Sequence, residues 1–158
     1  MLNIRPAVEA DAATIVELIR DLGEYERAPE KVRVTAEDIR TYGFGPNPRF
    51  GCFIAEWDGR PVGFALYYFT FSTWEGRPSL YLEDLFVHPP FRGRGIGKGL
   101  MVRLAQHAAA NDCTRFEWVV LDWNRSAMNF YESIGAFKLD DWFIYRMESE
   151  AIGRLAAS

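Results

Sequence analysis

The apolar residues near the N-terminus of this chain recur at the spacing of one helix face. The members of this set fall at i, i+3, i+4 and i+7 and are Ile15, Leu18, Ile19 and Leu22. Asp11 can cap this helix, and Gly23 predicts where it ends. Thr35, followed three residues later by Asp38, forms a variant capping box that predicts a second short helix to about Tyr42.

Apolar and aromatic runs farther along the chain predict strands that alternate with helices. Asp58-Gly59 is a strong signal for a tight hairpin between two of these strands. The predicted strands cover residues 3–6, 50–57, 62–71, 80–87, 116–121, 137–139 and 142–147. Helices are predicted at about residues 95–110, 125–134 and 148–158, with Gly135 ending the second. This alternation indicates an α/β fold with a sheet covered on both faces.

Length and composition narrow the class of protein. We expect the 158 residues to form a single domain over residues 1–158, and 49% hydrophobic residues are enough for a substantial core. No apolar run approaches about 18 residues, so no membrane span or membrane partner is expected. The start of the chain lacks the apolar core of a secretory signal, and Cys52 and Cys113 form no CxxC pair. These features predict a cytoplasmic protein without a metal site.

The net charge of −4 argues mildly against nucleic acid as a partner, since binding to nucleic acid favours a basic surface.

The chemistry of the sequence is concentrated in residues 80–100, LYLEDLFVHPPFRGRGIGKGL. A buried strand carrying Glu83 and Asp84 leads into a glycine-rich turn that opens a helix, an arrangement suited to binding phosphate. The turn has the spacing GxGxG, which fits neither the GxGxxG dinucleotide fingerprint nor a P-loop, because Gly97-Lys98 is followed by Gly99. The alternative to a phosphate site is a flexible turn that binds no ligand, with Gly99 allowing close packing of the helix.

Four segments together resemble the GCN5-related N-acetyltransferases, abbreviated GNAT. RGRGIG resembles that family's acetyl-coenzyme A signature. The segments YYFTFSTWEG, LYLEDLFV, RGRGIGKGL and LDWNRSAMNFYESIGA resemble more narrowly the diamine acetyltransferase branch, which acetylates spermidine, spermine or thialysine. The similarity runs from about residue 4 to about residue 147. It implies a mixed central sheet of six or seven strands with helices on both faces, and a homodimer.

The resemblance also implies where acetyl-coenzyme A is held. Backbone groups of Leu85, Phe86 and Val87 would pair with the pantetheine arm in the manner of an added strand. Residues of the glycine turn would hold the pyrophosphate, and residues near the start of a later helix would line the opposite wall. These two sets are Arg92, Gly93, Arg94, Gly95, Ile96, Gly97 and Lys98, and Asn124, Arg125, Ser126 and Ala127.

Acetylation of an amine needs a base, because an alkylammonium with a pKa of about 10.4 has no free lone pair at neutral pH. Strand alternation puts Glu83 on the face of Tyr81, Leu85 and Val87, and turns Asp84 to the opposite face. Glu83 is therefore the candidate base, directly or through a water, with burial expected to raise its pKa. The resemblance supports this role, because the diamine branch places its substrate-contacting glutamate here. Asp84 is expected to be a buried structural hydrogen-bond acceptor.

The remaining site residues follow from the resemblance. Tyr131 would protonate the leaving thiolate, although a tyrosine that packs on the sheet is the plainer interpretation. Tyr25, Glu26, Trp74, Glu83 and Asp141 would contact the amine substrate. The sequence EYERAPEKV is more similar to the thialysine-acetylating members. We therefore expect the substrate to be a small primary amine or diamine and leave its identity open.

Two other hypotheses remain open. One is a non-catalytic acyl-coenzyme A sensor that uses the same phosphate cradle, and the other is an enzyme of this family that acts on an unrelated amine. A sensor would not need Glu83 and Tyr131, so the presence of both favours an enzyme.

Overall fold

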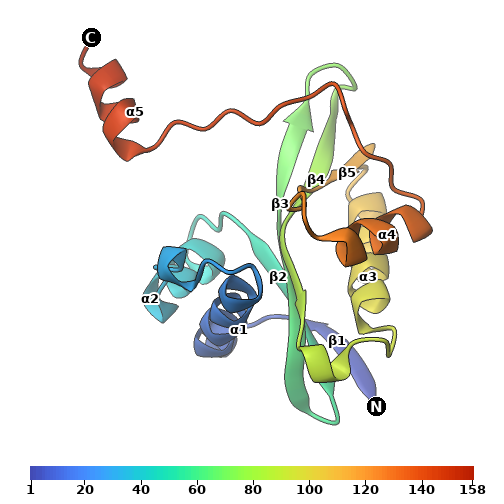
Figure 1. The fold of residues 1–158 in the computed structure, drawn as a ribbon. Coiled ribbons are helices and arrows are strands. Elements are labelled where there is room, and N and C mark those ends of the chain that lie inside the picture. Colours follow the sequence, from blue (N-terminus) through green and yellow to red (C-terminus); the bar gives the residue numbers. More distant parts are fainter. The chain divides into compact units, whose positions relative to one another are not determined.

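Five strands form one sheet in the order β1-β2-β3-β4-β5 in the computed structural model, which describes all of residues 1–158 (Figure 1). Neighbouring strands are antiparallel from β1 to β4, whereas β4 and β5 are parallel. The strands are β1 Leu2–Pro6, β2 Gly51–Trp57, β3 Arg60–Ser72, β4 Arg77–Val87 and β5 Arg115–Glu117. The mixed α/β class is confirmed, but the expected count of six or seven strands is wrong.

The chain divides into two compact units, residues 1–119 and residues 120–158. The first unit holds the whole sheet with α1 Ala12–Tyr25, α2 Ala36–Ile39 and α3 Ile96–Ala110. The second unit holds α4 Arg125–Ser133 and α5 Ser149–Ala156. None of these helices has the length and apolar character that a membrane crossing requires.

Helices cover both faces of the sheet in the first unit. α1 and α2 lie on one face and α3 on the other (Figure 1). Buried residues of α1 pack with Ile54, Phe64, Leu66 and Phe86 of β2, β3 and β4 in one apolar cluster. On the opposite face Gly99 lets α3 approach β1 closely, since a Cβ atom there would lie 2.8 Å from Cδ1 of Ile4.

The expectation that Gly23 ends the first helix is wrong. α1 continues to Tyr25, and Gly23 is buried within it. A Cβ atom at this position would lie 2.5 Å from Cγ2 of Val32, so the glycine serves the packing of the following segment. The helix therefore carries Tyr25 to its last turn and Glu26 to its C-cap instead of leaving them in a loop.

The late strands are also predicted incorrectly. β5 ends at Glu117 and not at residue 121, and residues 137–139 and 142–147 form no strand. A strand depends on a hydrogen-bonded partner, and these two segments do not pair with each other. An alternating pattern indicates a preference for extended backbone, but it does not show whether a neighbouring strand is available for pairing.

Candidate active site

β4 contains one extra residue where it passes the middle of β3. Leu66 of β3 lies opposite Asp84, and the next residue, Tyr67, lies opposite Leu82, so Glu83 has no partner on β3. Such a bulge interrupts strand alternation and redirects the side chains beside it. The alternation argument that placed Glu83 and Asp84 on opposite faces therefore does not apply.

Both carboxylates lie on the face that α1 covers. Asp84 is opposite Leu66, whose side chain belongs to the α1 cluster. Tyr68 is two residues farther along β3 and its hydroxyl donates to Oε2 of Glu83 at 3.2 Å. The ring of Tyr81 lies 5.2 Å from that of Tyr68. The expectation that Asp84 points away from Glu83 is wrong, because the bulge brings both to one face.

The two carboxylates have different surroundings. Glu83 is exposed, which contradicts the expectation that it is buried, whereas Asp84 is largely buried and receives no hydrogen bond. Burial, followed by the negative charges of Glu83 and Glu26, raises the pKa of Asp84 to about 7. Loss of water around its carboxyl also raises the pKa of Glu26. Three acidic side chains thus meet where α1 ends beside the bulge.

Two phenols complete this acidic cluster, which we define as Glu26, Glu83, Asp84, Tyr68 and Tyr81. Burial and the nearby Glu83 raise the pKa of Tyr68 to about 12, and the same two causes raise the pKa of Tyr81. Both hydroxyls are consequently neutral at physiological pH and can act as donors. The cluster has the chemistry of a site for an organic cation.

Arg92 connects the end of β4 to α1. Its Nε donates to the carbonyl of Val87 at 2.8 Å, and its guanidinium lies 4.2 Å from the ring centre of Tyr25 and 5.7 Å from that of Phe86. These contacts hold Tyr25 beside the site. Contact of Arg92 with a phosphate stays a prediction.

The glycine turn has the backbone conformation that the sequence pattern predicts. Gly93 and Gly95 have φ values of 75° and 77°, which side chains strongly disfavour, and Gly95 is the N-cap of α3. The amides of Ile96, Gly97 and Lys98 follow in the first turn, where no earlier helical carbonyl pairs with them. This geometry suits an anionic group such as a diphosphate. The guanidinium of Arg94 lies 5.2 Å from the ring of Trp57.

The β4 edge that faces β5 is paired over only part of its length. β5 pairs with Ser79, Leu80 and Tyr81, so the ladder ends before Leu85, Phe86 and Val87. Those three residues still pair with β3 on their other side. Backbone groups along this edge suit an extended ligand that adds to the sheet as a strand would.

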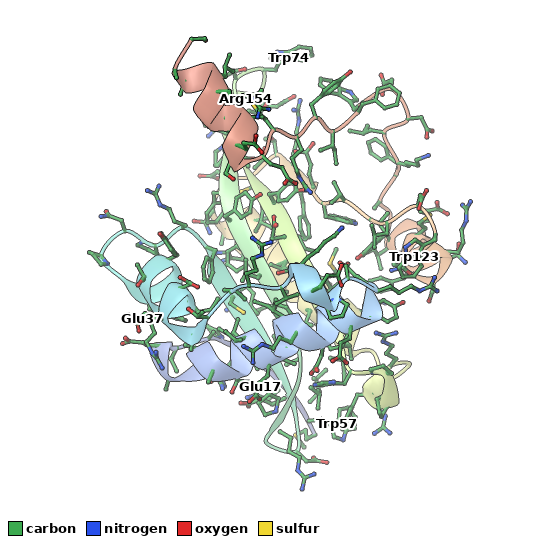
Figure 2. The ribbon with its side chains drawn as sticks, turned by 60° about the vertical axis from the view of Figure 1, so that its left-hand side comes forward. Glu17, Glu37, Trp57, Trp74, Trp123 and Arg154 are labelled. Carbon is green, nitrogen blue, oxygen red and sulfur yellow. The ribbon has the colours of Figure 1, made fainter.

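Trp74 lies far from the acidic cluster of its own chain. It occupies the turn between β3 and β4 and is 85% exposed. Four residues of β3, 69–72, follow Tyr68 before the turn begins, a distance of about 13 Å along an extended strand. Figure 2 shows Trp74 and Trp57 toward opposite ends of the sheet.

The second unit positions the other predicted residues on or near α4. Asn124 is the N-cap of α4 and its side chain accepts the N–H of Ala127 at 3.2 Å, a capping role that the sequence analysis missed. Arg125, Ser126 and Ala127 form the first turn of this helix. Asp141 lies in an exposed turn near the ion pair of Lys138 with Asp140.

Tyr131 is a half-buried residue near the end of α4. Its carbonyl accepts the N–H of Ala136 at 3.1 Å, and Gly135, with a φ of 95°, donates to Glu132. These bonds form the expected glycine-terminated helix end. The ring of Phe130 lies 5.4 Å from that of Tyr131.

Residues 13–136 match the family described as Acetyltransferase (GNAT) family. A thialysine N-epsilon-acetyltransferase of Sus scrofa is 42% identical over 164 residues, which cover 97% of this chain and 96% of that protein. A spermidine/spermine N(1)-acetyltransferase-like protein 1 of Homo sapiens is 37% identical over 95% of this chain and 23% of that longer protein.

Solved structures agree with this assignment of the fold. An integron cassette protein from the mobile metagenome of V. cholerae superposes with a TM-score of 0.84 at 28% sequence identity. The match covers 99% of this chain and 98% of that one.

Asp84→Asn should change how stability depends on pH. The folded state keeps a proton on Asp84 up to about pH 7, whereas the unfolded chain loses it near pH 4, so the wild type loses stability as pH rises between these values. Asparagine does not ionise and avoids this loss. We expect the free energy of unfolding of the variant relative to wild type to rise by about 1–3 kcal/mol from pH 4.5 to pH 8.

Urea denaturation at both pH values measures this difference, with Glu83→Gln as a control for the loss of one negative charge. A difference between Asp84→Asn and wild type that is the same at both pH values would contradict the raised pKa.

Proposed function

The chain belongs to the GNAT family of acetyltransferases and is an N-acetyltransferase, and from this premise we propose the identity of its reactants. The enzyme transfers acetyl directly from acetyl-coenzyme A to a primary amine of a small diamine, a polyamine or a lysine-like or thialysine-like substrate. The observation that carries this proposal is the acidic cluster at the β4 bulge, where three carboxylates and two phenols face one side of the sheet.

GNAT acetyltransferases use acetyl-coenzyme A, and the residues of this chain suit that cosubstrate. In the proposal its pantetheine arm extends along Leu85, Phe86 and Val87, whose edge is not paired with β5. Its diphosphate binds the turn from Gly93 to Lys98 at the start of α3. The first turn of α4, which Asn124 caps, supplies further contacts.

The acidic cluster performs two tasks in the proposed reaction. Its negative charges attract an alkylammonium into a partly dry site, where electrostatic attraction is stronger than in bulk water. A carboxylate of the bulge, Glu83 in the assignment from sequence, then removes a proton directly or through a water, which frees the nitrogen lone pair. Tyr25, Glu26 and Asp141 are the proposed substrate contacts besides Glu83. Trp74, which lies far from the acidic cluster of its own chain, would contact the substrate from the second subunit of a homodimer.

The relatives favour an amine of the lysine type over a long polyamine. The porcine relative is named for thialysine and matches this chain over nearly its full length. The human relative with spermidine and spermine in its name matches 95% of this chain at a lower identity, 37% against 42% for the porcine protein. A sensor of acyl-coenzyme A remains the alternative, and catalytic turnover distinguishes the two.

We also propose that the protein is a cytoplasmic homodimer. Phe69, Phe71 and Trp74 expose apolar surface on the β3–β4 hairpin, as a subunit interface would require. Cys52 and Cys113 are both free thiols, which suits a reducing compartment. The molecular mass in solution tests the dimer.

An amine panel with purified enzyme and acetyl-coenzyme A tests the function. We expect thiol release with thialysine, lysine or short diamines, and at least tenfold lower kcat/KM with small arylamines, whose neutral amines gain little from the acidic cluster. Binding of acetyl-coenzyme A without turnover would contradict the proposal and favour a sensor. Thiol release that does not depend on any added amine would contradict acetyl transfer to an amine.

Tyr131→Phe tests the proposed acid. The substitution removes one hydroxyl and keeps the ring, so kcat should fall by about 10²- to 10⁴-fold with acetyl-coenzyme A affinity nearly unchanged. Steady-state kinetics and calorimetry measure these two quantities, and Phe130→Leu on the same helix controls for loss of packing. Loss of affinity together with kcat would assign Tyr131 a structural role instead.

A further inference from the structure

The bulge presents two adjacent carboxylates that are unequal in their contacts. Glu83 is exposed and its Oε2 accepts the hydroxyl of Tyr68 at 3.2 Å. Asp84 is largely buried and accepts no hydrogen bond from any side chain or backbone N–H. A buried carboxylate without donors is costly to keep ionised, so Asp84 gains more than Glu83 from taking a proton.

The groups that face Asp84 strengthen this difference. Glu26 approaches from the C-terminal end of α1 and Glu83 from β4 itself, and both are acidic. On β3 the opposing residue is Leu66, which is apolar. Tyr68 and Tyr81 contribute neutral phenols, and the nearby guanidinium of Arg92 is directed to the carbonyl of Val87 and the ring of Tyr25. No cation pairs with Asp84.

We propose that Asp84, and not Glu83, receives the proton that the alkylammonium substrate loses, while Glu83 and Glu26 hold the cation beside it. This assignment rests on the proposed function. It gives the role of base to Asp84, which strand alternation had predicted to lie on the face opposite Glu83. Glu83 keeps a role in binding, because its exposed carboxylate is the first acidic group that an incoming amine meets.

The proposed step conserves atoms and charge. The ammonium gives one proton to the Asp84 carboxylate, which becomes a neutral carboxylic acid, and the nitrogen gains a free lone pair. The C–N bond then forms as the C–S bond of the thioester breaks. Tyr131, the proposed acid, protonates the departing sulfur, and the second amine proton restores the Tyr131 hydroxyl. Asp84 afterwards returns its proton to solvent, so the net products are the amide, free coenzyme A and one proton.

Burial makes Asp84 a better match to this task than an ordinary carboxylate. Its pKa of about 7 favours proton transfer from an ammonium by about a thousandfold over a carboxylate with a pKa near 3.9. Asp84 is about half ionised near pH 7 and mostly ionised by pH 8, so its carboxylate is available to accept a proton. An effective base combines these two properties near the working pH.

The pH dependence of kcat/KM distinguishes the two carboxylates. The wild type should gain activity as pH rises through about 7 and then level off. Asp84→Asn should lose about 10²- to 10³-fold at pH 7 and recover about tenfold per pH unit up to pH 9, as the free amine becomes available. The matched variant Glu83→Gln should raise KM for the amine and keep a rise in kcat/KM, shifted to lower pH because the charge of Glu83 also opposes ionisation of Asp84.

Glu26→Gln provides a second test that leaves both carboxylates of the bulge in place. Removal of this negative charge should shift the rise in kcat/KM to lower pH, because a neighbouring anion no longer opposes ionisation of Asp84. Acetyl-coenzyme A affinity, measured for every variant, shows whether each is folded.

A rise in kcat/KM that persists near pH 7 in Asp84→Asn, is absent at every pH in Glu83→Gln or does not move in Glu26→Gln would overturn the assignment while acetyl transfer remains established. A wild type that acetylates no amine would instead overturn the proposed function and this assignment with it.

Discussion

One extra residue in β4 determines the chemistry that this fold can support. Without it, strand alternation would direct Glu83 and Asp84 to opposite faces, and one of them would face α3. The bulge places both on the α1 face, where Glu26 at the end of that helix adds a third carboxylate. These like charges repel one another, and the packed core beside them holds the strands in place. Phe64, Leu66 and Phe86 of that core are nearly fully buried. The sheet therefore supplies the rigidity that a site of like charges requires.

β4 offers separate places for the two proposed reactants, one along its edge and one on its face. β5 stops pairing with β4 at Tyr81, and the free edge beyond it leads to the glycine turn at the start of α3. The acidic cluster lies on the face of β4 that α1 covers. In the proposed reaction, a ligand extended along the edge and a cation on the face would meet at this strand. This arrangement is consistent with direct transfer between two bound substrates.

Local patterns in the sequence predicted most of the helices and the first four strands. The Asp58-Gly59 hairpin, the start of α3 after Gly95 and the end of α4 at Gly135 follow from local backbone preferences, and all three are confirmed. Features that depend on distant partners were missed. The extension of α1 past Gly23 depends on Val32, and the bulge at Glu83 depends on registration with β3. The sequence therefore predicted the backbone of the glycine turn but assigned Asp84 to the wrong face, and the roles of Glu83 and of the turn stay predictions.

The central claim is that the fold holds a protonatable Asp84 beside two other carboxylates. Carbon-13 NMR of the aspartate side-chain carboxyls, with the Asp84 signal identified by its loss in Asp84→Asn, measures its titration directly. The account predicts a midpoint near pH 7, because burial and the charges of Glu83 and Glu26 oppose ionisation. A midpoint below about pH 5, close to that of an ordinary aspartate, would contradict it.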